Sequence, residues 1–190
     1  MKKFAALVLF LLSALVLAAC SNDDSTGSEP AGKAAHNAAD VTFATGMIPH
    51  HEQAVEMADM ALQMTQDPQI TELAQQIKDA QQPEIDTLTE WLTAWGEPLP
   101  DASSMGDHSG MPGMSGMMSA EDMAMLEQSS GTEFDQMWLE MMIEHHKGAV
   151  EMAQTQQADG KYPQALEMSE QIITSQQEEI DQMQELLSAL

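Results

Sequence analysis

Two pairs of adjacent histidines are the residues in this sequence most able to do chemistry. They stand in the stretches MIPHHEQAVEMA, from Met47 to Ala58, and MIEHHKGAVEMA, from Met142 to Ala153, which are offset by 145 − 50 = 95 residues. The offset holds without a gap from Asn37 to Leu92 of the first copy. A duplicated unit that keeps both histidines in phase favours a function for them.

Metal binding is the chemistry that the residue types favour. In each copy a methionine stands three residues before and another seven residues after the first histidine, so thioether and imidazole share a helical face. Thioether with imidazole suits copper(I), whereas iron, calcium and magnesium prefer oxygen-rich ligand sets. Met47 and His50 are close enough to bind one ion. Met57 lies about 15 Å from Met47 along a helix, so it belongs to a neighbouring site or to the core.

The two histidines of a pair are expected to do different jobs, because adjacent side chains point about 100° apart on a helix. We expect His50 and His145 to be ligands. His51 and His146 either bind a second ion or are partners across the bundle. The alternative is that all four are core histidines, each hydrogen-bonded to a buried glutamine or a carboxylate.

The elements that position these residues are four amphipathic helices with apolar residues at three-four spacing. Asn37, with Asp40 at the N3 position, predicts the first helix, which runs to about Thr65. Helix starts are also predicted at Asp67-Pro68, at Thr132 with Asp135, and at Tyr162-Pro163, with helix ends near Gly96 and Gly160. We expect four residues to hold the ligand side chains without touching the metal: Asp40, Asp135, Gln81 and Gln176.

The fold predicted is an all-α, ferritin-like four-helix bundle made of two repeated helical hairpins, because one hairpin cannot bury its own apolar face. The domain is expected over residues 37–190, with the first hairpin at 37–98 and a Met-rich linker at 99–119. A short helix, capped near Ser119, and the second hairpin fill residues 120–190. The long connection leaves more than one bundle topology open.

The linker is rich in Gly, Ser, Pro and Met, a composition that excludes a long helix. Its Met-x-x-Met spacing can wrap thioethers around a soft ion, and the auxiliary ligands it offers are Met105, His108, Met111, Met114, Met117 and Met118. The alternative is a low-complexity linker whose methionines are oxidised incidentally.

The first twenty residues predict an export signal, with two lysines before an apolar run that ends in Leu-Ala-Ala-Cys. This ending is similar to a bacterial lipobox, in which Cys20 becomes the lipidated first residue; the alternative is an uncleaved membrane anchor. Residues 21–36 are small and polar and predict a flexible tether. The domain is therefore expected outside the cytoplasm, lipid-anchored to a bacterial membrane, at the cell surface or in the periplasm.

Composition excludes several classes of function. The chain has 31 acidic residues against six lysines and no arginine, a formal net charge of −25, which is incompatible with nucleic-acid binding. Cys20 is the only cysteine, so the mature domain has neither disulfides nor thiolate ligands. No nucleophile–base constellation or phosphate-cradling loop is visible, so we do not predict hydrolysis or group transfer.

The doubled motif resembles the domain of unknown function 305 family over about residues 36–188. The first copy carries Asp40, Phe43, the stretch 47–58 and Gln81-Gln82-Pro83-Glu84-Ile85; the second carries Phe134-Asp135, the stretch 142–153 and Gln176-Gln177-Glu178-Glu179-Ile180. The resemblance implies a ferritin-like bundle, usually exported, with some members that bind copper and support copper tolerance. The metal positions it implies are Met47, His50, His51, Met57, Met142, His145, His146 and Met152.

The function predicted is that of a membrane-anchored protein, not an enzyme, that sequesters copper, as Cu(I), or delivers it to copper-transport or copper-oxidising proteins. One alternative is a ferritin-like di-iron or copper oxidoreductase. It needs several inward carboxylates, and the repeated candidates are Asp40, Asp135, Glu84 and Glu179. The other alternative is a structural or adaptor module that binds no metal.

Overall fold

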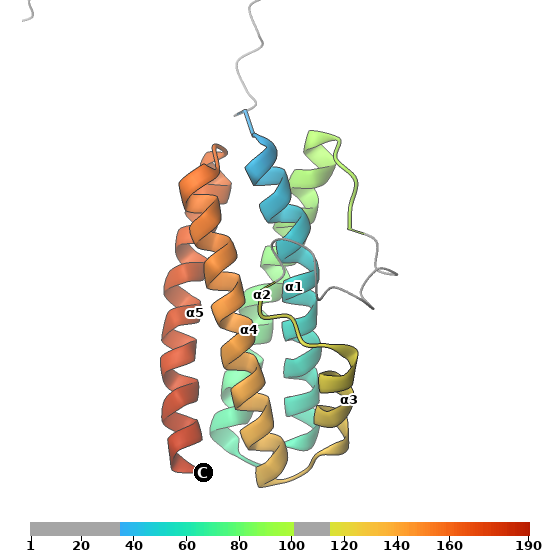
Figure 1. Cartoon of the computed structure of the whole chain (residues 1–190), viewed down its shortest axis with the longest axis vertical. Helices are drawn as coiled ribbons and strands as arrows, with labels where there is room; N and C mark the ends of the chain where they lie inside the picture. Colours follow the sequence, from blue (N-terminus) through green and yellow to red (C-terminus); the bar gives the residue numbers. More distant parts are fainter. Residues whose placement is uncertain (1–34, 101–114) are drawn as a thin grey trace, which may run out of the picture. The chain divides into compact units, whose positions relative to one another are not determined.

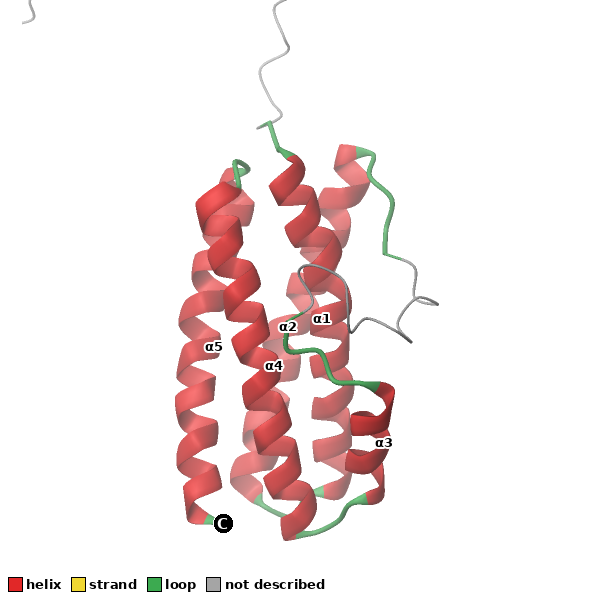
Figure 2. Ribbon diagram, in the orientation of Figure 1, coloured by secondary structure: helices red, strands yellow, loops and turns green. Residues whose placement is uncertain are grey.

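The structure, a computed structural model, describes residues 35–100 and 115–190, and the regular structure of these residues is entirely helical (Figure 1, Figure 2). The helices are α1 (Ala38–Met64), α2 (Pro68–Trp95), α3 (Ala120–Gln128), α4 (Thr132–Asp159) and α5 (Pro163–Ala189). The predicted all-α bundle of two hairpins is confirmed. The predicted export signal with Cys20, the tether up to residue 34, and Met105, His108, Met111 and Met114 of the linker lie outside the described residues.

Local sequence signals set most helix ends where they were predicted. The Asn37 side chain accepts from the Asp40 amide, and the Asp40 carboxylate accepts from the Asn37 amide, so the two form a capping box at the start of α1. Asp67 caps α2, whose first residue is a proline. Ser119 and Asp122 form a second capping box at the start of α3.

The start of α4 departs from the prediction. Thr132 is the first helical residue rather than the cap; the cap is Gly131, with φ +59° and no side-chain hydrogen bond to the helix. The Asp135 carboxylate instead accepts a hydrogen bond from the Thr65 hydroxyl, at 2.5 Å, just beyond the end of α1. The Asp135 side chain, which the local pattern assigns to the cap of α4, therefore binds a distant residue, Thr65, instead.

The two hairpins, α1–α2 and α4–α5, meet mainly through α1 and α4 (Figure 1). These two helices run antiparallel: the indole of Trp138 donates to the Met57 carbonyl at 2.8 Å, and His50, seven residues before Met57 in α1, lies against His145, seven residues after Trp138 in α4. At the other end, the Asp40 carboxylate accepts from the backbone amide of Tyr162 in the α4–α5 turn at 3.1 Å. The repeat mates Asp40 and Asp135 thus each form a hydrogen bond between their own hairpin and the turn of the other hairpin.

A polar layer divides the apolar core into two clusters. The first core cluster includes side chains of all five helices, among them Met57, Ile77, Leu126, Met142 and Ile180. The second draws on the four long helices, among them Met47, Ile85, Met152 and Ile172. Along each long helix, buried polar residues separate the two clusters, and together they form the polar layer: His50, His51, Gln81, His145, His146 and Gln176. The helices therefore bring all four repeated histidines to one level of the bundle.

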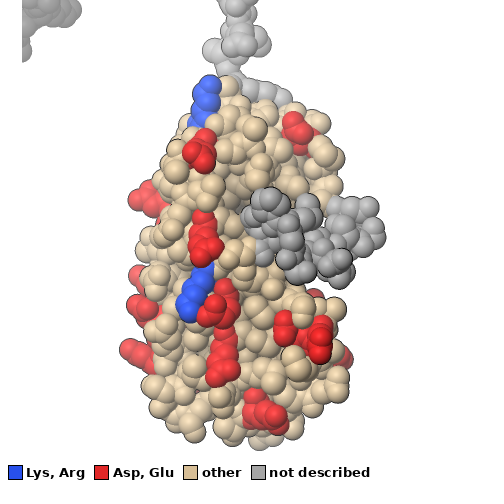
Figure 3. Space-filling view, viewed as in Figure 1, with Lys and Arg blue, Asp and Glu red and all other residues tan. Residues whose placement is uncertain are grey.

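The surface is acidic, in keeping with the formal net charge of −25. Aspartate and glutamate side chains are spread over much of the face drawn in Figure 3 and outnumber the lysines there. Within residues 35–100 and 115–190, no helix is long and apolar enough to cross a bilayer.

Candidate metal centre

The first histidines of the two repeats touch each other inside the bundle. His50 and His145 are buried, with ring centroids 3.8 Å apart and ring planes inclined by 46°. We call them the inner histidine pair. The centroid of His51 lies 6.5 Å from that of His50, and the centroid of His146 lies 6.5 Å from that of His145. The four rings therefore cross the polar layer in a row, with His51 and His146 as the outer histidines.

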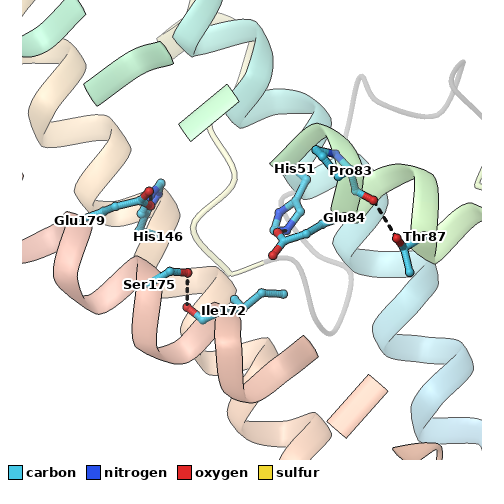
Figure 4. Close-up of polar contacts among 8 residues, drawn as sticks. All are labelled: His51, Pro83, Glu84, Thr87, His146, Ile172, Ser175 and Glu179. Atoms are coloured by element: carbon cyan, nitrogen blue, oxygen red, sulfur yellow. Dashed lines mark hydrogen bonds and ion pairs between the residues drawn. The ribbon is translucent and has the colours of Figure 1, made fainter. Parts of the chain in front are cut away.

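The outer histidines are each held by a glutamate of their own hairpin (Figure 4). His51 Nε2 lies 2.8 Å from Glu84 Oε2, and His146 Nε2 lies 2.7 Å from Glu179 Oε2. A carboxylate accepts, so each Nε2 donates and the buried Nδ1 is left without a hydrogen-bond partner. A histidine whose far nitrogen is anchored on a carboxylate is typical of metal sites, because the anchor fixes the tautomer and the ring orientation.

The ring of His50 is held differently, by the backbone of the segment that precedes α3. Its Nε2 lies 3.1 Å from the carbonyl oxygen of Ser115. Since a carbonyl only accepts, Nε2 carries the proton, and Nδ1, which is buried and has no partner, keeps its lone pair. Among residues 35–100 and 115–190, no side chain forms a hydrogen bond of good geometry with either ring nitrogen of His145, and only a weak backbone contact with His50 acts on the ring. A buried polar atom without a partner lowers the stability of a fold by roughly 1–3 kcal/mol. These ring nitrogens are therefore destabilising unless a ligand binds to them.

Burial keeps the inner pair neutral. Desolvation, with smaller contributions from His51 and His146, lowers the pKa of His50 to about 3, although the Ser115 carbonyl acts in the opposite direction. Desolvation, and next the proximity of His50, holds the pKa of His145 well below its usual range. Imidazole must be neutral to bind a metal, so this pair needs no deprotonation at neutral pH.

The four methionines of the repeats are buried on both sides of the polar layer. Met47 and Met152 belong to the second core cluster, and Met57 and Met142 to the first. Met47 precedes His50 by one helical turn and Met142 precedes His145 by one turn. Because α1 and α4 are antiparallel, these two thioethers flank the inner histidine pair from opposite sides, each about 4.5 Å along its helix from the ring it accompanies.

The residues expected to hold the ligands fall into two groups. Asp40 and Asp135 each stand ten residues before an inner histidine, about 15 Å along the helix, and each accepts a hydrogen bond from a hairpin turn of the other repeat. Gln81 and Gln176 lie in the polar layer itself. Both amide atoms of Gln81 and Oε1 of Gln176 are buried without partners. The structure thus brings only the glutamines to the level of the histidines.

Residues Ser115–Met118 form a strap that crosses α1 and α4 beside the inner pair. A Cβ on Gly148 of α4 would clash with the carbonyl of Ser115, so the strap lies directly on the α4 backbone. Gly116 has φ +83°, and a Cβ there would lie 2.6 Å from the carbonyl oxygen of Glu144. On α1, the Gln53 amide donates to the Met118 carbonyl at 2.9 Å and accepts from its amide at 2.7 Å.

The sequence reasoning missed the strap and its supports. One signal was available: Gln53 and Gly148 are repeat mates, and the duplicated motif differs there in size and polarity. The structure explains this difference: Gln53 forms hydrogen bonds with the strap, and Gly148 has no side chain that would clash with it. A hydrogen bond from histidine to a carboxylate was one predicted alternative, and the structure has such bonds for His51 and His146, with Glu84 and Glu179 as the carboxylates.

The chemistry open to this centre follows from its donor set. Within the described parts of the chain, no group of three or more His, Cys, Asp and Glu side chains could hold a metal ion. The available donors are two neutral imidazoles in contact and the thioethers one turn away. Such a set suits a soft ion that accepts few ligands, and it does not suit Mg²⁺ or Ca²⁺.

Comparison with known proteins gives relatives of the same architecture. A candidate secreted DUF305 protein from Streptomyces coelicolor, solved by crystallography, is 31% identical, with a TM-score of 0.72 over 80% of this chain and 93% of that chain. CopM in its Cu(II)-bound form is 34% identical, with a TM-score of 0.69 over 79% of this chain and 96% of that chain. The Cu(I)-bound form of CopM gives 30% identity and a TM-score of 0.65 over the same shares, 79% and 96%. CopM is also known with silver bound. No curated protein matches the sequence.

The family resemblance read from the doubled Met/His motif is confirmed. The family model described as Domain of unknown function (DUF305) matches residues 40–187, which cover the four long helices except the first two residues of α1 and the last two of α5, and include both histidine pairs. The chain therefore belongs to the DUF305 family.

Proposed function

We propose that this protein binds copper, as Cu(I), as a cargo at the inner histidine pair, with Met47 and Met142 as the adjacent thioether ligands. One observation carries the proposal: His50 and His145 come from the two repeats, meet in the core at a centroid distance of 3.8 Å, and keep buried nitrogens without partners. A protein core retains such atoms at a cost, and a soft cation offsets that cost.

The comparisons support this choice of metal. CopM, which is known in Cu(I)-bound, Cu(II)-bound and silver-bound forms, shares the fold and about a third of its residues with this chain. Silver and copper(I) are both soft ions, which matches the donor set of the inner histidine pair and its flanking methionines.

The outer histidines have a more structural role in this proposal. Glu84 and Glu179 orient His51 and His146. The buried Nδ1 atoms of these two histidines either bind a second ion or bind none, as the sequence analysis left open. Met57 and Met152 are ligands of neighbouring ions or core residues. Of the linker, Met117 and Met118 lie half-buried within the strap, and in this proposal they act with the other linker methionines as auxiliary ligands.

The location proposed is outside the cytoplasm, with Cys20 as the lipid anchor. It rests on the charged start, apolar run and Leu-Ala-Ala-Cys ending of the first twenty residues. At a membrane surface, a copper store of this kind sequesters the ion or hands it to a copper-transport or copper-oxidising protein. Thioether ligands fit such a compartment, since thiols are readily oxidised there.

The rival functions fit the geometry less well. A di-iron oxidoreductase needs clustered carboxylates, whereas Glu84 and Glu179 each contact a different outer histidine and Asp40 and Asp135 bind the hairpin turns. A metal-free adaptor module accounts for the outer histidines, which are hydrogen-bonded. It gives no reason for the unpartnered nitrogens of the inner pair.

The experiment that tests the proposal is a competitive Cu(I) titration of residues 21–190 against a chromophoric chelator under reducing conditions. This chain lacks the Cys20 thiol, which would bind Cu(I) by itself. His50→Ala with His145→Ala is expected to lower the affinity of the bundle site at least about 100-fold, and Glu84→Ala with Glu179→Ala about 10-fold. Replacing methionines 105 to 118 by Ser is expected to remove only weaker equivalents. If the histidine variant binds as tightly as the unmodified chain and only the linker variant loses copper, the inner pair is not the site.

A further inference from the structure

A cavity of about 430 Å³ lies between the N-terminal half of α1 and the C-terminal half of α4. Ser115 of the strap is part of its lining, as are Phe43 of α1 and Met152 of α4. Ser115 is also the residue whose carbonyl accepts from His50 Nε2. Ser115 therefore borders both the cavity and the inner histidine pair.

The cavity exists because the two repeats differ at this position. Thr42, Gly46, Thr155 and Asp159 belong to its lining. At the offset of 95, their repeat mates are all methionines: Met137, Met141, Met60 and Met64. Those methionines pack against the first core cluster. At one end of the α1–α4 contact, large flexible side chains thus fill the space between the two helices, whereas at the other end their repeat mates are small or polar and the space is open.

The lining has the donor atoms of a cation site. Glu151 and Asp159 supply exposed carboxylates, and Met152 supplies a buried thioether. Gln156, only 1% exposed, also lines the cavity; its amide nitrogen donates to Asp40, whereas its Oε1 has no hydrogen-bond partner among the residues that the structure describes. Among the described residues that form the lining, none is a lysine or a histidine. Oxygen and sulfur acceptors without a competing positive charge favour a cation as the occupant.

We propose that this cavity is a loading site, where a copper cation is first held before it passes to the inner histidine pair. The inference rests on the proposed function and adds the route to it. The carboxylates of Glu151 and Asp159 attract the ion, and Oε1 of Gln156 and the thioether of Met152 hold it weakly. Passage to the pair then requires the contact between Ser115 and His50 to open.

The test is the rate at which the detergent-solubilised full chain takes Cu(I) from a chromophoric chelator, followed by stopped flow at low ionic strength. Glu151→Gln with Asp159→Asn is expected to slow loading about 5–10-fold, because a charged cleft raises the local concentration of the ion. The slowing should shrink as salt is added, and the affinity at equilibrium should stay within about twofold. The matched control is Glu56→Gln with Glu140→Gln, which also removes two exposed carboxylates and includes the repeat mate of Glu151; it should load at the unmodified rate.

A second variant tests the space rather than the charge. Gly46→Met with Thr155→Met gives the cavity the side chains that the other repeat carries at these positions, and it should slow loading at least as much. If both cavity variants load as fast as the control, the cavity is not the loading site, although the copper site in the bundle still stands. If the unmodified chain takes no copper from the chelator, the proposed function fails and this inference fails with it.

Discussion

The imidazole of His50 lies against the imidazole of His145, with 3.8 Å between ring centroids, at the contact between α1 and α4. The two residues are repeat mates, 95 positions apart. Each hairpin therefore supplies one half of the centre, and neither half is complete without the other. This explains why both copies keep the motif, whereas one copy would suffice for a histidine that served only its own hairpin.

The close contact between the strap and α4 predicts the effect of Gly148→Ala. In a helix this change ordinarily stabilises by roughly 0.5–1 kcal/mol, because glycine is a poor helix former. Here the added methyl group meets the Ser115 carbonyl, so we expect a destabilisation of about 1–3 kcal/mol in urea unfolding. Gly46→Ala, at a half-buried helical glycine that lines the cavity, is the control variant. A Gly148→Ala variant as stable as the control would show that the strap does not press on α4.

The glutamate anchors predict a difference between two substitutions at one position. Glu84→Ala leaves His51 Nε2 buried without a partner, which should lower the free energy of unfolding by roughly 1–3 kcal/mol. Glu84→Gln keeps an acceptor oxygen and should lose less. The same pair of changes at Glu179 should behave alike, because that residue holds His146 in the equivalent way. Chemical denaturation of the metal-free protein measures both, and equal losses for Ala and Gln would contradict the assigned contact.

The lowered pKa of His50 predicts a pH dependence of stability. Its pKa is about 3 in the folded protein against 6.5 ordinarily, so as the pH falls below about 6.5 the unfolded chain binds a proton before the folded one does. Stability should therefore fall between pH 7 and pH 5, by about 2 kcal/mol for His50 alone. Urea unfolding of the metal-free protein at both pH values measures this. A His50→Gln, His145→Gln variant should lose most of the pH dependence; if it keeps all of it, the inner pair is not the source.

A separate loss is expected at lower pH from Asp40. Burial by itself would raise the pKa of this carboxyl, but its hydrogen bonds, from the Gln156 side chain and from backbone amides, outweigh burial and lower the pKa below 3.8. The stabilisation is present above the unfolded value of about 4 and is lost as the pH falls below it. The histidine and aspartate contributions thus occupy different pH windows, so a scan from pH 7 to pH 3 separates them.

Features governed by local sequence could be predicted. The Asn37–Asp40 box and the Asp67-Pro68 start depend on residues within one turn of each other, and the burial of all four histidines follows from their helical spacing. The duplication itself predicted that both hairpins are needed to enclose one core. These arguments fixed the fold class and the buried position of the candidate ligands.

Features that depend on contacts between distant segments could not be predicted. The long linker left the topology open, so the meeting of His50 and His145 did not follow from sequence. The Thr132 cap was wrong because Asp135 binds Thr65, 70 residues earlier in the chain. The strap was missed because a backbone carbonyl, that of Ser115, has no side-chain signature; only the mismatch between Gln53 and Gly148 pointed to it.

The most direct test of the central claim is anomalous diffraction at the copper edge from crystals of residues 21–190 loaded with one equivalent of Cu(I). We predict a single strong peak within bonding distance of a ring nitrogen of His50 and of His145, with the thioether of Met47 or Met142 next to it. A strong peak only among the linker methionines, or none in the polar layer, would contradict the claim that the inner histidine pair holds the copper.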